Sequence, residues 1–174
     1  MTLEALKDSL GDFAKDIKLN LSTVLTIEGA PDLQQKQIYG IALASAYSTK
    51  NRAVIDAVIQ AAGILSGAEL NAAKAAASIM AMNNVYYRFV HLISDEEYGK
   101  MPAKLRMNVI GNPGIEKIDF ELYCLAVSAI NGCGKCMDAH AHEVAKAGVS
   151  KLGIQSVIRI ASVINAVTQA ASIG

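Results

Sequence analysis

The stretch that decides the fold class reads SGAELNAAKAAASIMAMNNVYYRF and covers residues 66–89. Ser66 and Glu69 have the Ser-x-x-Glu spacing in which each side chain accepts a hydrogen bond from the other residue's backbone N–H. An alanine-rich run follows, and alanine has the highest helix propensity of the twenty residues. The segment therefore predicts one long helix that begins at Ser66 and ends near Phe89.

Three shorter helices are expected before this segment. Apolar side chains recur at steps of three and four residues at the start of the chain, which is typical of one face of an amphipathic helix: Leu3, Leu6, Leu10 and Phe13. Residues 21–31 are rich in Thr, Gly and Pro and separate this helix from a second one over 33–49. A third helix over 52–62 follows Asn51, a residue type that is common at N-caps.

The second half of the chain is also expected to be helical. Pro102, Gly111 and Pro113 interrupt residues 91–113, which we interpret as the connection between the halves. Asp119 is expected to cap a helix that ends near residue 130. Two more helices follow over 133–147 and 150–172. Because 28 residues are alanine and no alternating strand pattern stands out, the sequence predicts an all-α fold.

The two halves share a weak pattern. Residue types agree at an offset of about 84 positions: Ser66 with Ser150, and residues 77–79 with residues 161–163. This indicates an internal duplication of a three-helix unit within one domain of residues 1–174, with possible halves at 1–92 and 114–174. At this offset the counterparts of the two cysteines discussed below are near Thr49 and Arg52, which carry no thiol. Chemistry is therefore expected in the second copy only.

Composition restricts the classes of function. Sixteen Lys and Arg balance sixteen Asp and Glu, so no basic surface for nucleic acid or an anionic membrane is expected. Only 18% of residues are charged, which leaves little polar surface for a monomer and predicts association of subunits. The first residues lack the apolar core of a secretory signal. Polar residues interrupt the apolar tail over 157–173, so we expect no membrane-spanning helix and a cytoplasmic protein.

The motif that could carry chemistry is Cys133-Gly134-Lys135-Cys136, with His140 four residues further on. Residues three and four apart share one face of a helix, so two thiols and an imidazole lie along one stripe. The positive end of the helix dipole stabilises a thiolate there and lowers the pKa of the thiol. Two cysteines at this spacing can also close into a disulfide, so that one sulfur resolves the oxidised state of the other. The pattern favours a redox dithiol.

Spacing alone leaves other interpretations open. A zinc site could recruit His140 or His142 to the two cysteines, although residues two apart on a helix do not face the same side. Glu121 lies on the preceding helix, and an antiparallel return could bring it close to His140. Alternatively, Glu121 is a solvated carboxylate in the first helical turn, where the helix dipole favours it. Cys124 is expected to be a small buried apolar residue.

The combined pattern resembles the alkyl hydroperoxidase D family of the carboxymuconolactone decarboxylase-like superfamily. The similarity rests on Glu121, the Cys-Gly-Lys-Cys motif, His140 and the preceding Ser128-Ala129-Ile130-Asn131-Gly132, and extends to residues 13–21, 82–88 and 105–115. The resemblance implies an all-helical homotrimer and an antioxidant, thiol-dependent peroxidase that reduces alkyl hydroperoxides. It implies no metal and no bound cofactor. The implied reductant is dihydrolipoamide on a lipoyl-bearing acyltransferase, and the implied partner is a peroxiredoxin that the protein re-reduces.

The same resemblance assigns roles to individual residues. It implies that Cys136 attacks the peroxide and becomes a sulfenic acid, that Cys133 is the resolving thiol, and that Glu121 and His140 form a proton relay. Lys135 departs from the family pattern, since some members have histidine between the cysteines. This puts an assisting role in proton transfer at that position in doubt, although a positive charge still favours a thiolate.

Three other functions remain alternatives to the peroxidase. The first is a disulfide reductase or adaptor that acts on the thiols of another protein. The second is a zinc-stabilised helical binding protein. The third is a helical scaffold in which the cysteines carry no chemistry.

Overall fold

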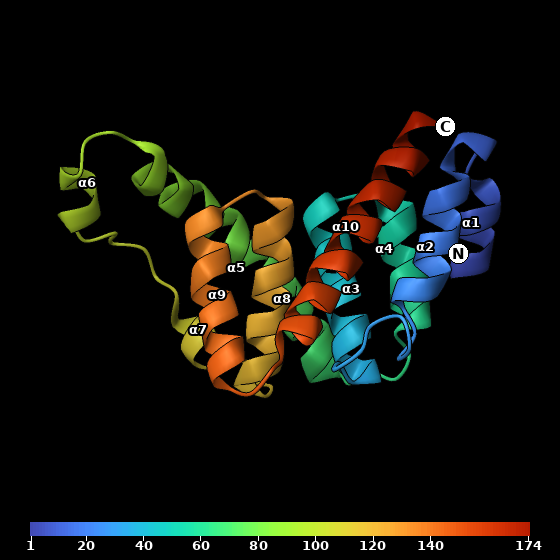
Figure 1. Ribbon diagram of the computed structural model, residues 1–174, viewed down its shortest axis with the longest axis horizontal. Coiled ribbons are helices and arrows are strands. Elements are labelled where there is room, and N and C mark those ends of the chain that lie inside the picture. The colour runs from blue at the N-terminus through green and yellow to red at the C-terminus, as the bar shows by residue number, and fades with distance from the viewer.

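The computed structural model describes all 174 residues and confirms the all-α fold (Figure 1). It contains no β-strand. In chain order the elements are α1 (Leu3–Ser9), the 3-10 helix η1 (Asp12–Ala14), α2 (Lys15–Val24), α3 (Gln35–Thr49), α4 (Arg52–Ala61), α5 (Gly67–Leu92), α6 (Glu97–Lys100), α7 (Asn108–Gly111), α8 (Lys117–Ile130), α9 (Gly134–Lys146) and α10 (Lys151–Ile173).

The start of the chain differs from the single helix that its apolar repeat predicts. Leu10 adopts an extended conformation after α1, and Gly11 continues the extended backbone, so the chain bends before η1. Leu6 and Leu10 are buried as expected, whereas Phe13 lies beyond the bend and is exposed. The helix α2 then takes in residues 21–24, which the sequence places in a loop.

The helix starts expected at Asn51, Ser66 and Ser150 are confirmed. Ser66 and Glu69 form the capping box of α5, and Asn51 and Ser150 cap α4 and α10. The prediction for Asp119 is wrong, because α8 begins two residues earlier at Lys117. Asp119 instead accepts a hydrogen bond of 2.7 Å from Gln37 Nε2 on α3, and burial raises the pKa of its carboxyl group.

Two three-helix units, α3–α5 and α8–α10, match the expected duplication. The first and second helices of the units begin 82 residues apart, and the third helices begin 84 residues apart. The offset differs because α9 is longer than α4. The counterparts of Cys133 and Cys136 are therefore Asn51 and Val54, each two residues beyond the expected Thr49 and Arg52, and neither carries a thiol.

The third helix of each unit crosses the other unit. The helix α5 packs on α8 and α9, and α10 packs on α3 and α4. Equivalent hydrogen bonds of 2.9 Å fix the two crossings, one from Asn131 to Asn84 and one from Thr168 to Thr49. A core of 34 buried residues runs through both units. The site described below lies at the crossing of α5 over α8 and α9.

The helix α10 is long and apolar enough, by length and composition, to cross a membrane. In this fold it buries eight residues along its length and packs between α2, α3 and α8. It is a core helix of the two-unit fold.

The end of α5 and the segment after it project from the body of the molecule (Figure 1). Phe89 on α5 and Tyr98 on α6 pack edge to face, with their ring centroids 5.2 Å apart. Several large apolar side chains on this projection are exposed: Val85, Phe89, Leu92, Ile93, Tyr98 and Met101. We call these six residues the projecting arm.

Candidate redox site at the start of α9

The two cysteines stand at the turn between α8 and α9. Gly132 has a φ of 68°, in the left-handed region that favours glycine, and this conformation turns the chain back after α8. Cys133 then becomes the N-cap of α9, where its Sγ accepts a hydrogen bond of 3.3 Å from the backbone N–H of Cys136. Cys133 and Cys136 form a disulfide. Cys133 is fully enclosed, whereas Cys136 retains 6% of its surface, so Cys136 is the sulfur that can be reached.

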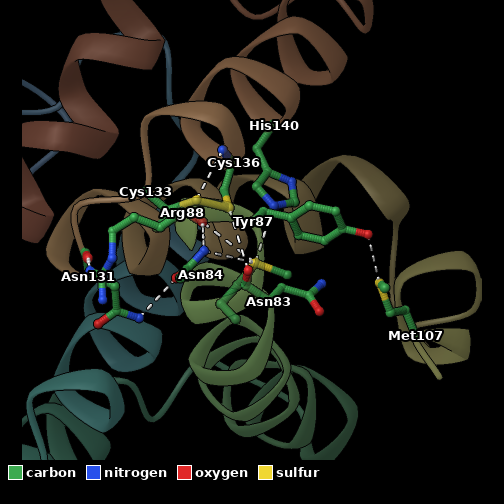
Figure 2. Close-up of a disulfide and its surroundings, with 11 residues drawn as sticks. Asn83, Asn84, Tyr87, Arg88, Met107, Asn131, Cys133, Cys136 and His140 are labelled. Atoms are coloured by element: carbon green, nitrogen blue, oxygen red, sulfur yellow. Dashed lines mark hydrogen bonds between the residues drawn. A yellow bond between two sulfur atoms is a disulfide. The ribbon is translucent and has the colours of Figure 1, made fainter. Parts of the chain in front are cut away.

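A pocket of about 210 Å³ leads to Cys136 (Figure 2). Its walls are mostly apolar and come from α5, from α9 and from the segment that precedes α8, with Met80, Tyr87, Met107 and Ile110 as the main apolar groups. Lys135 is exposed at the pocket, with its Nζ 6.0 Å from the centre of the Tyr87 ring. The pocket offers an apolar path to the sulfur with a positive charge beside it.

Glu121 and His140 meet behind the disulfide. Glu121 Oε2 lies 2.6 Å from His140 Nδ1, and both side chains are buried. The interpretation of Glu121 as a solvated carboxylate is therefore wrong, because α8 turns this face toward α9. A carboxylate at this distance accepts the Nδ1 proton and fixes the orientation of the ring. The other ring nitrogen, Nε2, lies 3.2 Å from Met80 Sδ.

A chain of hydrogen bonds ties α5 to the turn that carries the cysteines. Ser128 Oγ contacts Met80 Sδ at 3.5 Å and accepts a hydrogen bond of 3.0 Å from Asn84 Nδ2. Asn84 Oδ1 accepts from Asn131 Nδ2, and Arg88 donates to the carbonyl oxygen of Asn131 at 2.6 Å. The turn between α8 and α9 is thus held from the neighbouring unit.

The structure brings together all four residues that the sequence points to, Glu121, Cys133, Cys136 and His140. Sequence reasoning did not place the residues that α5 contributes: Met80, Asn83, Asn84, Tyr87 and Arg88. Two adjacent asparagines within an alanine-rich helix were the available signal. Their contacts lie more than 40 residues away in the sequence, so helical periodicity could not identify their partners.

The remaining candidate residues stand apart from this arrangement. His142 is exposed, whereas His140 is buried. No group of three or more His, Cys, Asp or Glu side chains lies close enough together to hold a metal ion. Cys124 is a free, enclosed cysteine, as expected, and burial raises the pKa of its thiol, with the nearby Glu121 charge adding to the effect.

A buried histidine–carboxylate pair beside a helix-capping disulfide defines a class of helical redox proteins, and residues 96–173 match the carboxymuconolactone decarboxylase family. The chain is 60% identical to alkyl hydroperoxide reductase AhpD of Coxiella burnetii, across 96% of the chain and 95% of that relative. It is 55% identical to the protein of that name from Rhodopseudomonas palustris, across 96% of the chain and 91% of that relative. The protein of that name from Streptomyces griseus is 54% identical, across 96% of the chain and 93% of that relative. The chain belongs to the alkyl hydroperoxide reductase AhpD family.

Proposed function

We propose that this protein is an antioxidant oxidoreductase that reduces alkyl hydroperoxides through Cys133 and Cys136. The observation that carries the proposal is the pocket, because the accessible sulfur of a disulfide and a carboxylate-bound histidine line the same apolar space. An apolar pocket suits the organic part of an alkyl hydroperoxide. The names of the relatives support the same substrate class.

In the oxidising half of the reaction, the Cys136 thiolate attacks the terminal oxygen of the hydroperoxide. A sulfur–oxygen bond forms, the oxygen–oxygen bond breaks, and the alkoxide that leaves takes a proton from His140. Cys136 is then a sulfenic acid. The Cys133 thiol then gives up its proton as its sulfur attacks that of Cys136, the sulfur–oxygen bond breaks, the leaving hydroxyl takes up a proton to become water, and the disulfide forms. Glu121 acts as a positioning residue that holds the imidazole through Nδ1.

The reducing half uses the difference between the two sulfurs. An external dithiol can approach Cys136 but not the enclosed Cys133. Attack on Cys136 expels the Cys133 thiolate, which accepts the backbone N–H of Cys136 at the helix start. A stabilised thiolate leaves faster in thiol–disulfide exchange. The N-cap position of Cys133 therefore favours both its roles, as resolving thiol and as leaving group.

We also propose that the electrons come from dihydrolipoamide on a lipoyl-bearing acyltransferase, and that the protein re-reduces a partner peroxiredoxin. The limited approach to Cys136, which is only 6% exposed, supports a thin, flexible dithiol as the reductant. The same approach disfavours a general reductase of folded proteins. A peroxiredoxin would have to present its disulfide on a flexible segment to reach the pocket.

A cytoplasmic homotrimer is the proposed assembly, with residues 1–174 as one domain. The continuous core through both units supports the single domain. The projecting arm exposes six large apolar side chains, and burial of such a surface between subunits is favourable. Sedimentation equilibrium should give three times the 18.4 kDa chain mass, and Phe89→Glu should shift the protein toward monomer. A monomeric wild-type protein at micromolar concentration would contradict the trimer.

One experiment tests the activity. The loss of an organic hydroperoxide is followed with metal-free protein and either dihydrolipoamide or glutathione as reductant. We expect turnover with the lipoyl dithiol and little with glutathione. If neither reductant supports turnover and the purified protein carries about one zinc per subunit, the zinc-binding alternative replaces the peroxidase.

A further inference from the structure

We propose that Asn83 binds the hydroperoxide and donates a hydrogen bond from its amide to the leaving oxygen. This inference rests on the proposed peroxidase function. Asn83 would be a substrate-binding residue on α5, outside the unit that carries the cysteines. Its position, its unpartnered amide and its counterpart in the other unit support the assignment independently.

The position of Asn83 places it beside the reacting sulfur. Its backbone carbonyl oxygen lies 4.0 Å from Cys136 Sγ, and its side chain lines the same pocket as Cys136 and His140. Figure 2 shows its amide on the opposite side of the site from Asn84 and Asn131. The amide of Asn83 is therefore available to a molecule that reaches Cys136.

The amide of Asn83 has no hydrogen-bond partner within the protein. Only 4% of the residue is exposed, and Oδ1 is a fully enclosed acceptor without a donor. Its neighbour Asn84 is equally buried but uses both amide atoms, toward Ser128 and Asn131. Buried amides are nearly always hydrogen-bonded, because an unpaired polar group is destabilising. Asn83 thus lacks the structural role that accounts for Asn84.

The duplication shows that the fold does not require an amide at this position. At the 84-residue offset of α5 and α10, the counterpart of Asn83 is Val167, which is fully buried in the core. An apolar side chain is therefore compatible with this crossing. Asparagine at residue 83 adds a polar group where the equivalent position carries valine, and Asn83 lines the pocket of the dithiol.

The chemistry of the peroxide step calls for a donor at this place. When the Cys136 thiolate attacks the terminal oxygen, negative charge develops on the alkoxy oxygen as the oxygen–oxygen bond breaks. Because Oδ1 is enclosed, the N–H groups of Nδ2 are the atoms that can face a ligand in the pocket. A fixed donor stabilises a developing oxyanion and aligns the breaking bond with the sulfur. Asn83 does not transfer a proton, because the proton that the alkoxide takes up comes from His140.

The test uses the isosteric variants Asn83→Leu and Asn83→Asp in full-length protein. Reduced protein is mixed with cumene hydroperoxide, and the rate of disulfide formation is measured in a single turnover. We expect Asn83→Leu to lower the second-order rate constant by about a hundredfold, a typical effect of removing one such donor. Asn83→Asp keeps the shape and the acceptor oxygens but has no N–H, so it should lose at least as much.

Two control reactions separate substrate binding from a general disturbance. Reduction of the disulfide by dithiothreitol and alkylation of reduced Cys136 by iodoacetamide involve no alkoxy leaving group. Both rates should stay within about twofold of wild type in Asn83→Leu, since neither reaction depends on the donor and this variant adds no charge beside the Cys136 thiolate. If Asn83→Leu does not fold, the smaller Asn83→Ala takes its place in the same three reactions.

The outcomes distinguish the inference from the function on which it rests. Wild-type turnover together with an unchanged peroxide rate in Asn83→Leu overturns the role of Asn83 and leaves the peroxidase intact. A wild-type rate in Asn83→Asp shows that no N–H donor is needed and also overturns it. Absence of hydroperoxide reduction by the wild-type protein overturns the proposed function, and the role of Asn83 with it.

Discussion

The crossing of α5 over α9 and the crossing of α10 over α4 have the same helix arrangement but different side chains at their centres. Where α10 crosses α4, the central side chains are apolar and fully enclosed: Val54, Val58, Ile164 and Val167. At the 82- and 84-residue offsets the equivalent residues where α5 crosses α9 are Cys136, His140, Met80 and Asn83. The crossing of α10 over α4 stabilises the fold, whereas the crossing of α5 over α9 surrounds a pocket. The site at the crossing of α5 over α9 therefore differs from the other crossing in its side chains and not in how the helices pack.

The N-caps of α4 and α9 also differ in side chain while making the same contact. Asn51 caps α4 by accepting a hydrogen bond of 3.3 Å from the backbone N–H of Val54. Cys133 caps α9 by accepting one of the same length from Cys136. A capping position already faces unpaired backbone N–H groups, and these groups also stabilise a thiolate. The redox centre thus occupies a site that in the other unit serves only helix formation.

The largest effect should come from giving the second unit the residues of the first. Cys136→Val should abolish hydroperoxide turnover, because the attacking sulfur is removed. Cys133→Asn should also stop turnover while leaving a sulfenic acid at Cys136, since the resolving thiol is lost and the cap is kept. Mass spectrometry of protein trapped with dimedone measures the adduct. An adduct on Cys133 in Cys136→Val would reverse the assignment of the two sulfurs.

A smaller loss should follow from disrupting the pair that has no counterpart in the first unit. Glu121→Gln and His140→Gln should each lower peroxide turnover by roughly ten- to ten-thousandfold, the range for general acid–base catalysis. If Glu121 acts through His140, the double variant should cost little more than the worse single one. Additive losses would show two independent roles, and wild-type turnover in Glu121→Gln would remove Glu121 from the mechanism.

The two equivalent hydrogen bonds between the units should differ in their effect on stability. Asn84→Ala removes two hydrogen bonds and leaves the buried Ser128 and the partly buried Asn131 without their partner, so the free energy of unfolding should fall by about 1–3 kcal/mol. Thr168→Val removes a bond in a partly buried site and should cost about 1 kcal/mol or less. Urea unfolding of the oxidised proteins measures both. Equal losses would show that the two crossings are held with the same strength.

The sequence predicted most of the helices and the grouping of Cys133, Cys136 and His140, because the signals for both are local, whereas the role of Glu121 came from the family resemblance. Ser66 and Ser150 mark helix starts through contacts with residues only three positions further on. Helical spacing places Cys133, Cys136 and His140 on one face. The partners of Asn84 and the position of Asn83 in the pocket could not be predicted, since they depend on α5 crossing the other unit. The Asp119 prediction failed for the same reason, because Gln37 on another helix engages its carboxylate.

The smallest effect is expected at Cys124, the one cysteine whose counterpart in the first unit shows what the position requires. That counterpart is Ala42, which is fully buried like Cys124 itself. Cys124→Ala should leave hydroperoxide turnover unchanged and cost about 1 kcal/mol of stability through the lost sulfur contacts. In native, oxidised wild-type protein, Cys124 should resist iodoacetamide and react only after unfolding.

The raised pKa of Cys124 gives this prediction a dependence on pH. Burial, aided by the charge of Glu121, keeps the thiol protonated in the folded state, whereas in the unfolded chain it ionises near its ordinary value. Stability is therefore fully present below the unfolded pKa and is lost as pH rises above it, by about 1.4 kcal/mol for the first full unit. Cysteines 133 and 136 do not titrate while they are joined in the disulfide. The free energy of unfolding of oxidised wild type should thus fall more steeply than that of Cys124→Ala between about pH 8.5 and 10. Parallel curves, or alkylation of Cys124 in the native protein, would show an accessible thiol and would bring Cys124 into the redox site.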